Sequence, residues 1–200
     1  MVLLEAATEV NDRLINADTA HAGKLDFFDL IDMRMLSGLI GEMFVDSLAS
    51  REPRLRKNPN LDGYPDLCDV SNKKTDLPIE AYLDFPDGGL EVKNTFGTKT
   101  SGADLAPRQT RHRSIQKRLT WKAHHQFTNH LVALQTDYID RTPQIVRGFF
   151  ANDLTTEDWS TRAEPKPGSA MTSFCQTLSS AHRKLIEQTV FGRPSYLENS

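Results

Sequence analysis

The sequence predicts an α/β protein in which helices flank a mixed central β-sheet. Near the N-terminus, apolar residues recur at three- and four-residue intervals, which is typical of amphipathic helices. Shorter apolar runs bounded by turn sequences follow in the middle of the chain and are typical of strands. Helical spacing returns near the C-terminus. The predicted order is therefore helices, three strands, a helix, two strands and a helix.

The predicted helices cover residues 2–16, 26–49, about 109–128 and the tail from 169 to 190. The second has the clearest apolar face, formed by Phe27, Leu30, Ile31, Met35, Leu36, Leu39, Ile40, Met43, Phe44 and Leu48. The predicted strands are residues 66–70, 78–85, 90–94, 131–139 and 144–151. A Pro-Asp-Gly-Gly turn at 86–89 separates the second strand from the third, and a short turn at 140–143 separates the last two.

Composition predicts one domain over residues 1–200, because a chain of this length can bury a core without disulfides. Apolar residues make up 38% and charged residues 26%, and the mean hydropathy of −0.49 argues against a membrane protein. The start of the chain has acidic residues and lacks the basic region of a signal peptide. Cys68 and Cys175 are interpreted as buried thiols in a reducing compartment, so a cytoplasmic location is expected.

Charge is distributed unevenly along the chain. Between Thr98 and Lys122 seven basic residues stand against one acidic residue, a local charge of +6 in a chain whose total is −3. A smaller basic stretch, RLRK, occupies residues 54–57. Such segregation favours a face that binds a polyanion, although a solvated basic loop would give the same pattern.

Carboxylates occur where strands usually carry apolar residues. Asp66 opens one predicted strand, and Glu91 and Lys93 point to the same face of another because strand side chains alternate. Two carboxylates brought together can hold Mg²⁺, which prefers one or two protein carboxylates plus a phosphate. A lysine beside them can orient a water nucleophile, help to deprotonate it, or offset developing charge.

Pro65-Asp66 followed by Glu91-Val92-Lys93 resembles the PD-(D/E)xK motif of type II restriction endonucleases and related nucleases. The resemblance covers about residues 36–95. It implies a restriction-endonuclease-like mixed sheet and Mg²⁺-dependent hydrolysis of phosphodiester bonds in double-stranded DNA. It also implies that Asp66 and Glu91 bind the metal, that the Val92 carbonyl adds a ligand, and that Lys93 is the catalytic lysine.

Three carboxylates around this motif leave alternatives open. Many members of the superfamily carry a glutamate on the preceding helix, and Glu42 fits that position, but it also fits a solvent-facing residue. Asp62 is the alternative to Asp66, although its place before a turn favours a turn-forming role. Asp69 lies three residues beyond Asp66, so it faces the other side of a regular strand.

The predicted helix at 109–128 combines basic, amide and histidine side chains that suit phosphates and base edges. The expected DNA-binding residues are Arg108, Arg111, Arg113, Gln116, Lys117, Arg118, Lys122, His124 and His125. A polar amphipathic helix without a DNA role would show the same spacing, and a histidine metal site is a weaker alternative.

The function favoured is that of a type II restriction endonuclease that recognises a short sequence. One active site per subunit implies a homodimer for cutting both strands of a symmetric target. The alternatives are a structure-selective, repair or nicking endonuclease with the same core, a non-catalytic DNA-binding protein, and a hydrolase of small phosphoesters.

Overall fold

The computed structural model describes residues 1–21, 28, 31–59, 65–70, 89–97, 115, 118–122, 125, 128–164, 167 and 173–197. Its helices are α1 (Val2–His21), α2 (Met33–Arg51), the 3₁₀ helix η3 (Thr156–Asp158), α4 (Ser179–Glu187) and α5 (Pro194–Leu197). Its strands are β1 (Leu55–Lys57), β2 (Leu67–Asp69), β3 (Gly89–Phe96), β4 (Thr120–Lys122), β5 (Leu131–Ile139), β6 (Thr142–Ala151), β7 (Phe174–Gln176) and β8 (Thr189–Gly192).

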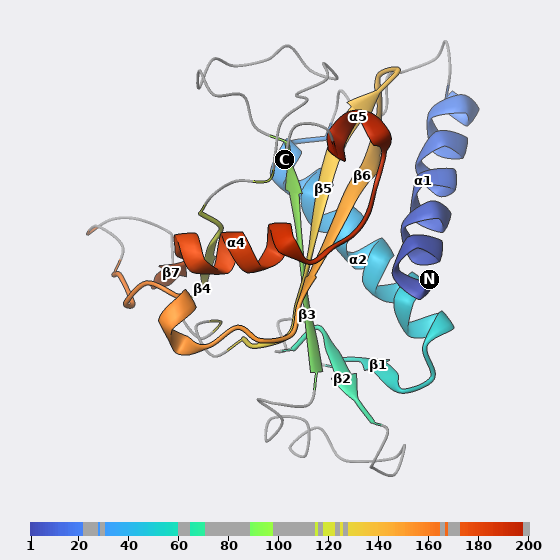
Figure 1. The fold of residues 1–200 in the computed structure, drawn as a ribbon. Helices are drawn as coiled ribbons and strands as arrows, with labels where there is room; N and C mark the ends of the chain where they lie inside the picture. Colours follow the sequence, from blue (N-terminus) through green and yellow to red (C-terminus); the bar gives the residue numbers. More distant parts are fainter. Residues whose placement is uncertain are drawn as a thin grey trace.

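A six-stranded mixed sheet in the order β1-β2-β3-β5-β6-β8 forms the centre of the protein (Figure 1). Strands β3 and β5 are parallel, and the other neighbouring pairs of this sheet are antiparallel. Strands β4 and β7 form a separate antiparallel pair. The mixed α/β class predicted from the sequence is therefore confirmed.

Helices cover both faces of the sheet. Helices α1 and α2 lie on one side and α4 on the other, as Figure 1 shows. The first side encloses an apolar cluster that includes Leu36, Ile40 and Phe44 of α2. The second encloses a cluster in which Trp121, Trp159 and other side chains pack on β5 and β6. Because both its faces are covered, β5 is buried along almost its whole length.

The β5–β6 hairpin shows how a tight turn fixes register. Ile139 pairs with Thr142, which leaves a two-residue loop of Asp140 and Arg141. Both loop residues have positive φ, 48° and 69°, as hairpin loops of this length require. The predicted strand at 131–139 is confirmed to the residue, and the following strand begins at Thr142, two residues earlier than predicted.

The other predicted elements agree to different degrees. The first helix is confirmed and extends to His21. The second, predicted at 26–49, is confirmed from Met33 and extends to Arg51, but the prediction is wrong at Ile31 and Asp32, because the Asp32 side chain accepts from the Arg34 N–H and caps the helix there. The strand predicted at 66–70 occupies Leu67–Asp69, and the one at 90–94 extends over Gly89–Phe96. The strand predicted at 78–85 lies outside the described residues.

Two predicted helices are wrong in part. Residues Thr120–Lys122, inside the helix predicted at 109–128, form β4. Residues Phe174–Gln176, inside the predicted tail helix, form β7, and α4 begins only at Ser179. The reason is that these segments, more than fifty residues apart, pair with each other, with Trp121 opposite Cys175. Such non-local pairing overrides local spacing. None of the described helices is long and apolar enough to cross a membrane.

Candidate active site

Asp66 lies directly before β2, at the end of the strand that pairs with β3. Strand β2 starts one residue later, and its pairing sets Leu67 opposite Leu90. One step further along this antiparallel ladder, the Asp66 backbone N–H donates to Glu91 Oε2 at 3.3 Å. The Val92 backbone N–H donates in turn to Asp66 Oδ2 at 2.8 Å. The short β2 strand therefore brings Asp66 and Glu91, twenty-five residues apart in sequence, into direct contact.

Gly89 makes this junction possible. A Cβ atom at this position would lie 2.1 Å from Pro65 Cγ and 2.5 Å from the Leu67 carbonyl oxygen. Both distances are far below van der Waals contact, so only glycine lets β3 approach the Pro65-Asp66 segment so closely. The glycine that the sequence marks as part of a turn is the first residue of β3 and a close-packing position.

The residues of β3 serve two faces of the sheet. Asn94 faces α2, because its side-chain amide donates to the Ser37 carbonyl at 3.2 Å, and Val92 shares that face by alternation. Glu91 and Lys93 point to the opposite face. There, Glu91 Oε1 lies 3.2 Å from His125 Nδ1, and Lys93 Nζ lies 5.2 Å from the centre of the Trp121 ring. The predicted shared face of Glu91 and Lys93 is thus seen in their contacts.

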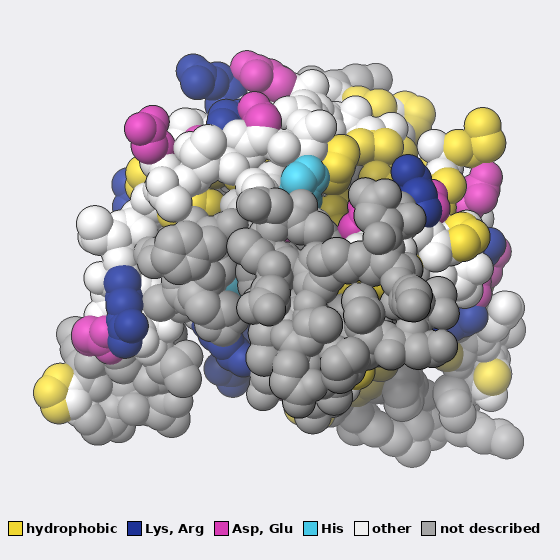
Figure 2. Space-filling view, turned by 90° about the horizontal axis from the view of Figure 1, so that it is seen from below, with side chains coloured by type: hydrophobic (Ala, Val, Ile, Leu, Met, Phe, Trp, Pro, Cys, Tyr) yellow, Lys and Arg dark blue, Asp and Glu magenta, His cyan; other side chains and the backbone are white. Residues whose placement is uncertain are grey.

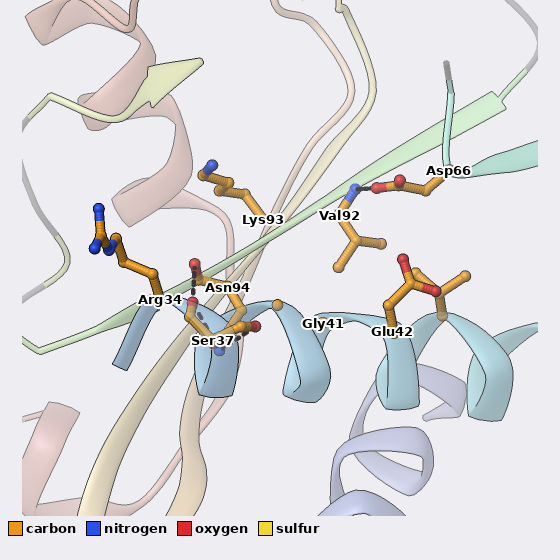
Figure 3. A pocket seen from close by; sticks show the side chains of 10 residues that line it. Arg34, Ser37, Gly41, Glu42, Asp66, Val92, Lys93 and Asn94 are labelled. Carbon is orange, nitrogen blue, oxygen red and sulfur yellow. Dashed lines mark hydrogen bonds between the residues drawn. The ribbon is translucent and has the colours of Figure 1, made fainter. Parts of the chain in front are cut away.

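A cavity of about 350 Å³ opens between α2 and β3. Figure 3 shows Glu42 directed from α2 toward Asp66, with Val92 of β3 beside them. The described lining residues are Arg34, Ser37, Gly38, Gly41, Glu42, Val45, Asp66, Val92, Lys93 and Asn94. Glu91 is not among them and is only 5% exposed as a residue, whereas Lys93, its neighbour on the same face of β3, is long enough to border the cavity.

Glu42 is the most exposed carboxylate of this group. Its side chain is 58% exposed, and its Oε2 lies 2.8 Å from Lys57 Nζ of β1. The same ammonium contacts Asp46 one turn further along α2, also at 2.8 Å. Glu42 therefore lines the same cavity as Asp66 and is also solvent-accessible. Both interpretations made from the sequence, a glutamate of the site and a solvent-facing residue, are compatible with this position.

Burial and mutual repulsion shift the protonation of the site. Burial is the main cause that raises the pKa of Asp66, and the negative charge of Glu42 adds to it, against the Val92 hydrogen bond and two lysines. Burial also raises the pKa of Glu91, and the charge of Asp66 raises it further. Burial lowers the pKa of Lys93, opposed by Glu91 and Asp66. Three neighbouring groups thus resist their usual charge states.

This donor set suits a hard divalent cation. Two adjacent carboxylates whose ionised forms are disfavoured would both gain from a cation between them. Val92 N–H points to Asp66, and the carbonyl of a strand residue points to the same side as its N–H, so a third oxygen faces this edge. Within the described residues, no cluster of three or more His, Cys, Asp or Glu side chains is close enough to hold a metal. Mg²⁺ needs only one or two carboxylates, because it keeps several waters.

The expected DNA-binding residues are only partly described. Arg118 and Lys122 are exposed, and His125 is buried, 8% exposed, beside Glu91. The other six, Arg108, Arg111, Arg113, Gln116, Lys117 and His124, lie outside the described residues. Figure 2 shows described Lys and Arg side chains standing beside acidic ones at several points of one face, so its described part is not uniformly basic.

Of the two alternative metal ligands, the structure describes Asp69 alone, and it does not enter this arrangement. Asp69 lies at the other end of β2, where it pairs with Leu55 of β1. Asp62 lies outside the described residues. Of Asp66 and Asp69, Asp66 is therefore the residue that contacts Glu91, through its backbone N–H.

Two residues at the site were not proposed from the sequence. Lys57, at the end of the RLRK stretch, reaches across to Glu42, and Trp121 forms the surface under Lys93. The RLRK stretch was visible as a basic run, but nothing local indicates that its last residue faces α2. Trp121 lies within the segment predicted as a helix at 109–128, and its contact with Lys93 depends on β4 being a strand.

Comparison with known proteins gives no relative: no family model matches the chain, and neither a curated protein nor a solved structure matches it. The functional argument therefore depends on the site itself.

Proposed function

We propose that this protein is a Mg²⁺-dependent DNA endonuclease of the type II restriction kind. The observation that carries the proposal is the meeting of Asp66, Glu91 and Lys93 at one edge of β3, with Glu42 across the adjoining cavity. The two parts of the PD-(D/E)xK-like motif are 25 residues apart, and a chance match would not require them to be in contact.

Asp66, Glu91 and the Val92 carbonyl would hold Mg²⁺. When bound, the metal supplies positive charge that stabilises the negative charge developing on the phosphate. The protein contributes rigidity, because Asp66 is fixed by the Val92 N–H and Glu91 by the Asp66 N–H. Carboxylates held by strand backbone keep their positions better than carboxylates on loops.

Lys93 lies beside both carboxylates and is partly withdrawn from water. As a neutral amine, Lys93 can accept a hydrogen bond from the attacking water and so orient it. As an ammonium, it can offset negative charge on the phosphate. Hydrolysis forms one bond from the water oxygen to phosphorus and breaks the bond to the leaving 3′ oxygen, which takes up a proton. Glu42 is the accessory carboxylate that faces this reaction from α2.

The proposed substrate is double-stranded DNA, and the proposed assembly is a homodimer. The +6 charge between Thr98 and Lys122 supports a polyanionic substrate, since phosphate contacts dominate DNA affinity. Cutting both strands of a symmetric site needs two such centres related by a two-fold axis. A cytoplasmic location is part of the proposal and agrees with the free, buried thiols Cys68 and Cys175.

The test is digestion of unmodified phage DNA by the purified protein, with and without Mg²⁺. Discrete fragments that require Mg²⁺ and vanish in Lys93→Ala are the expected result. Asp46→Asn is the matched control, because Asp46 is an exposed carboxylate on α2 that contacts Lys57 but does not line the cavity.

Other outcomes would replace the proposal. Nicked plasmid without discrete fragments would identify a structure-selective or nicking enzyme with the same centre. DNA binding without cleavage on several unmodified DNAs would identify a non-catalytic DNA-binding protein.

A further inference from the structure

Two aromatic side chains form a surface against the face of β3 that carries Glu91 and Lys93. These two residues, Trp121 of β4 and His125, are called here the aromatic wall. Trp121 is 6% exposed and His125 is 8% exposed, and their ring centres are 5.4 Å apart. The wall lies on the face opposite α2, so it is separate from the lining of the cavity between α2 and β3.

The wall is held firmly from behind. Trp121 stacks on Trp159 with ring centres 5.1 Å apart, and its strand pairs with β7. Trp159 is fixed by a hydrogen bond from its Nε1 to the Thr128 carbonyl at 3.3 Å. The backbone N–H of Thr128 donates to the His125 carbonyl at 2.9 Å, so Thr128 links Trp159, behind the wall, to His125. A surface anchored in this way can impose an orientation on a flexible side chain that touches it.

Each member of the wall contacts one of the reactive groups. Lys93 Nζ lies 5.2 Å from the centre of the Trp121 ring, within the range of a cation–π interaction. His125 Nδ1 lies 3.2 Å from Glu91 Oε1, a close polar contact that lacks the geometry of a hydrogen bond. Packing alone would not bring the polar ends of a lysine and a glutamate onto a buried aromatic surface, because apolar side chains fill such space better.

Geometry makes this contact useful for catalysis. Lysine has four rotatable side-chain bonds, so without a partner its amine would sample positions away from the phosphate. Glu91 can also rotate its carboxylate, and its other oxygen is fixed by the Asp66 N–H. The His125 contact at Oε1 therefore completes the restraint of the carboxylate.

We propose that Trp121 and His125 are positioning residues of the active site, with Trp121 directing the Lys93 amine and His125 directing the Glu91 carboxylate. This inference rests on the proposed nuclease function and adds two residues to its machinery. Neither residue touches the substrate or the reacting atoms in this assignment. Both act through the group they hold.

A graded series at Trp121 tests the first half. Trp121→Leu is expected to lower kcat by about 10- to 100-fold, the range typical of residues that orient an active-site group. Trp121→Phe keeps a weaker aromatic face, so its kcat is expected to lie between those of the wild type and Trp121→Leu. Affinity for DNA, measured without Mg²⁺ by fluorescence anisotropy, should stay within about two-fold of the wild type, because binding does not require a directed Lys93 amine.

The control is Trp159→Phe. It disturbs the same aromatic stack but leaves the ring under Lys93 in place. A loss of kcat in Trp159→Phe equal to that in Trp121→Leu would show that packing alone is responsible, and it would overturn the role of Trp121.

A rescue pair tests the second half. His125→Leu should lower kcat about 10-fold or more, whereas His125→Asn should restore most of it, because an Asn side-chain nitrogen can occupy the place of Nδ1. Equal loss in both variants would overturn the role of His125.

A spectroscopic readout is independent of cleavage. The ε-methylene protons of Lys93, identified by their absence in Lys93→Ala, should be shifted upfield by the Trp121 ring current in the metal-free protein. The shift should be lost in Trp121→Leu. An unshifted resonance in the wild type would overturn the contact itself.

Different results would overturn the positioning role and the proposed function. If the wild type cleaves DNA and Trp121→Leu and His125→Leu cleave equally well, the positioning role is overturned and the proposed function stands. If the wild type cleaves no DNA, the proposed function is overturned and the positioning role with it, even where the ring-current shift is present.

Discussion

Glu91 and Asp158 are both almost completely buried carboxylates, 5% and 3% exposed, but their pKa values move in opposite directions. Burial raises the pKa of both groups. At Glu91 the neighbouring Asp66 adds to that rise. At Asp158, hydrogen bonds from Lys184 and others outweigh burial, and the pKa is lowered.

The contacts explain the difference. Asp158 Oδ2 accepts from Lys184 Nζ at 2.8 Å and from the Thr155 backbone N–H at 2.9 Å, closing the turn of η3. Glu91 instead has the negative charge of Asp66 close by and the His125 ring 3.2 Å from its Oε1. The protein thus surrounds Asp158 with a cation and hydrogen bonds that lower its pKa, whereas it places a like charge beside Glu91, whose pKa is raised. A buried group with a strongly shifted pKa is typical of functional sites.

The largest expected effect separates the two carboxylates by activity. Glu91→Gln should reduce Mg²⁺-dependent DNA cleavage by roughly 10²- to 10³-fold or more, because the amide removes a charged oxygen from the reacting centre. Asp158→Asn should leave cleavage by the folded protein within about two-fold of the wild type, because it lies outside that centre. Single-turnover cleavage rates measure both. Equal activity of the two variants would contradict the assignment of Glu91.

The next expected effect is on stability and concerns Asp158. Asp158→Asn should lower the free energy of unfolding by about 2 kcal/mol, since it removes a buried hydrogen-bonded charge from Lys184. Urea unfolding at pH 7 measures the change. Asp153→Asn is the control, because Asp153 contacts the same Lys184 at 3.6 Å but is 54% exposed, and it should change stability by less than about 0.5 kcal/mol.

The contribution of Asp158 should depend on pH with a definite sign. Its pKa is lowered in the folded state, so its stabilisation is present above its ordinary value of 3.8 and is lost as the pH falls toward the folded value. The gap in stability between the wild type and Asp158→Asn should therefore narrow below about pH 4. A gap that stays constant down to pH 2 would contradict the ionic origin of the effect.

The opposite sign is expected at the candidate active site. Glu91 has a raised pKa when folded, so folding without metal costs nothing extra below its ordinary value of 4.5, where both states are protonated. The cost grows as the pH rises and the unfolded chain ionises first. Glu91→Gln should therefore stabilise the metal-free protein by about 1 kcal/mol at pH 7 to 8 and by almost nothing near pH 4. Thermal unfolding in EDTA at the two pH values tests this.

An effect of similar size is expected from the metal itself. Mg²⁺ at about ten times its dissociation constant should stabilise the wild type by about 1.4 kcal/mol, because it binds the folded site alone. Asp66→Asn and Glu91→Gln should lose most of this increment, and Asp158→Asn should keep it. Melting curves with and without about 10 mM Mg²⁺ measure the difference. An equal increment in all variants would place the metal elsewhere.

Local sequence was sufficient wherever local rules decide structure. Strand β5 follows from an apolar run, α2 from helical spacing, and the close relation of Glu91 to Lys93 from strand alternation. The motif in the sequence predicts Asp66 as a site residue, and the β2–β3 ladder brings it to Glu91. The helix expected through Trp121 was wrong, because the apolar spacing of one segment does not reveal a partner strand more than fifty residues away.

By itself, the sequence determined the mixed α/β class, most of the described elements of the central sheet and the carboxylate–lysine set. Only the tertiary structure decided that Glu91 and Lys93 rest on Trp121 and His125, that Lys57 pairs with Glu42, and that Asp66 hydrogen-bonds to Val92. The physical reason is that periodicity gives the face on which a side chain lies. What opposes that face depends on packing between segments far apart in the chain.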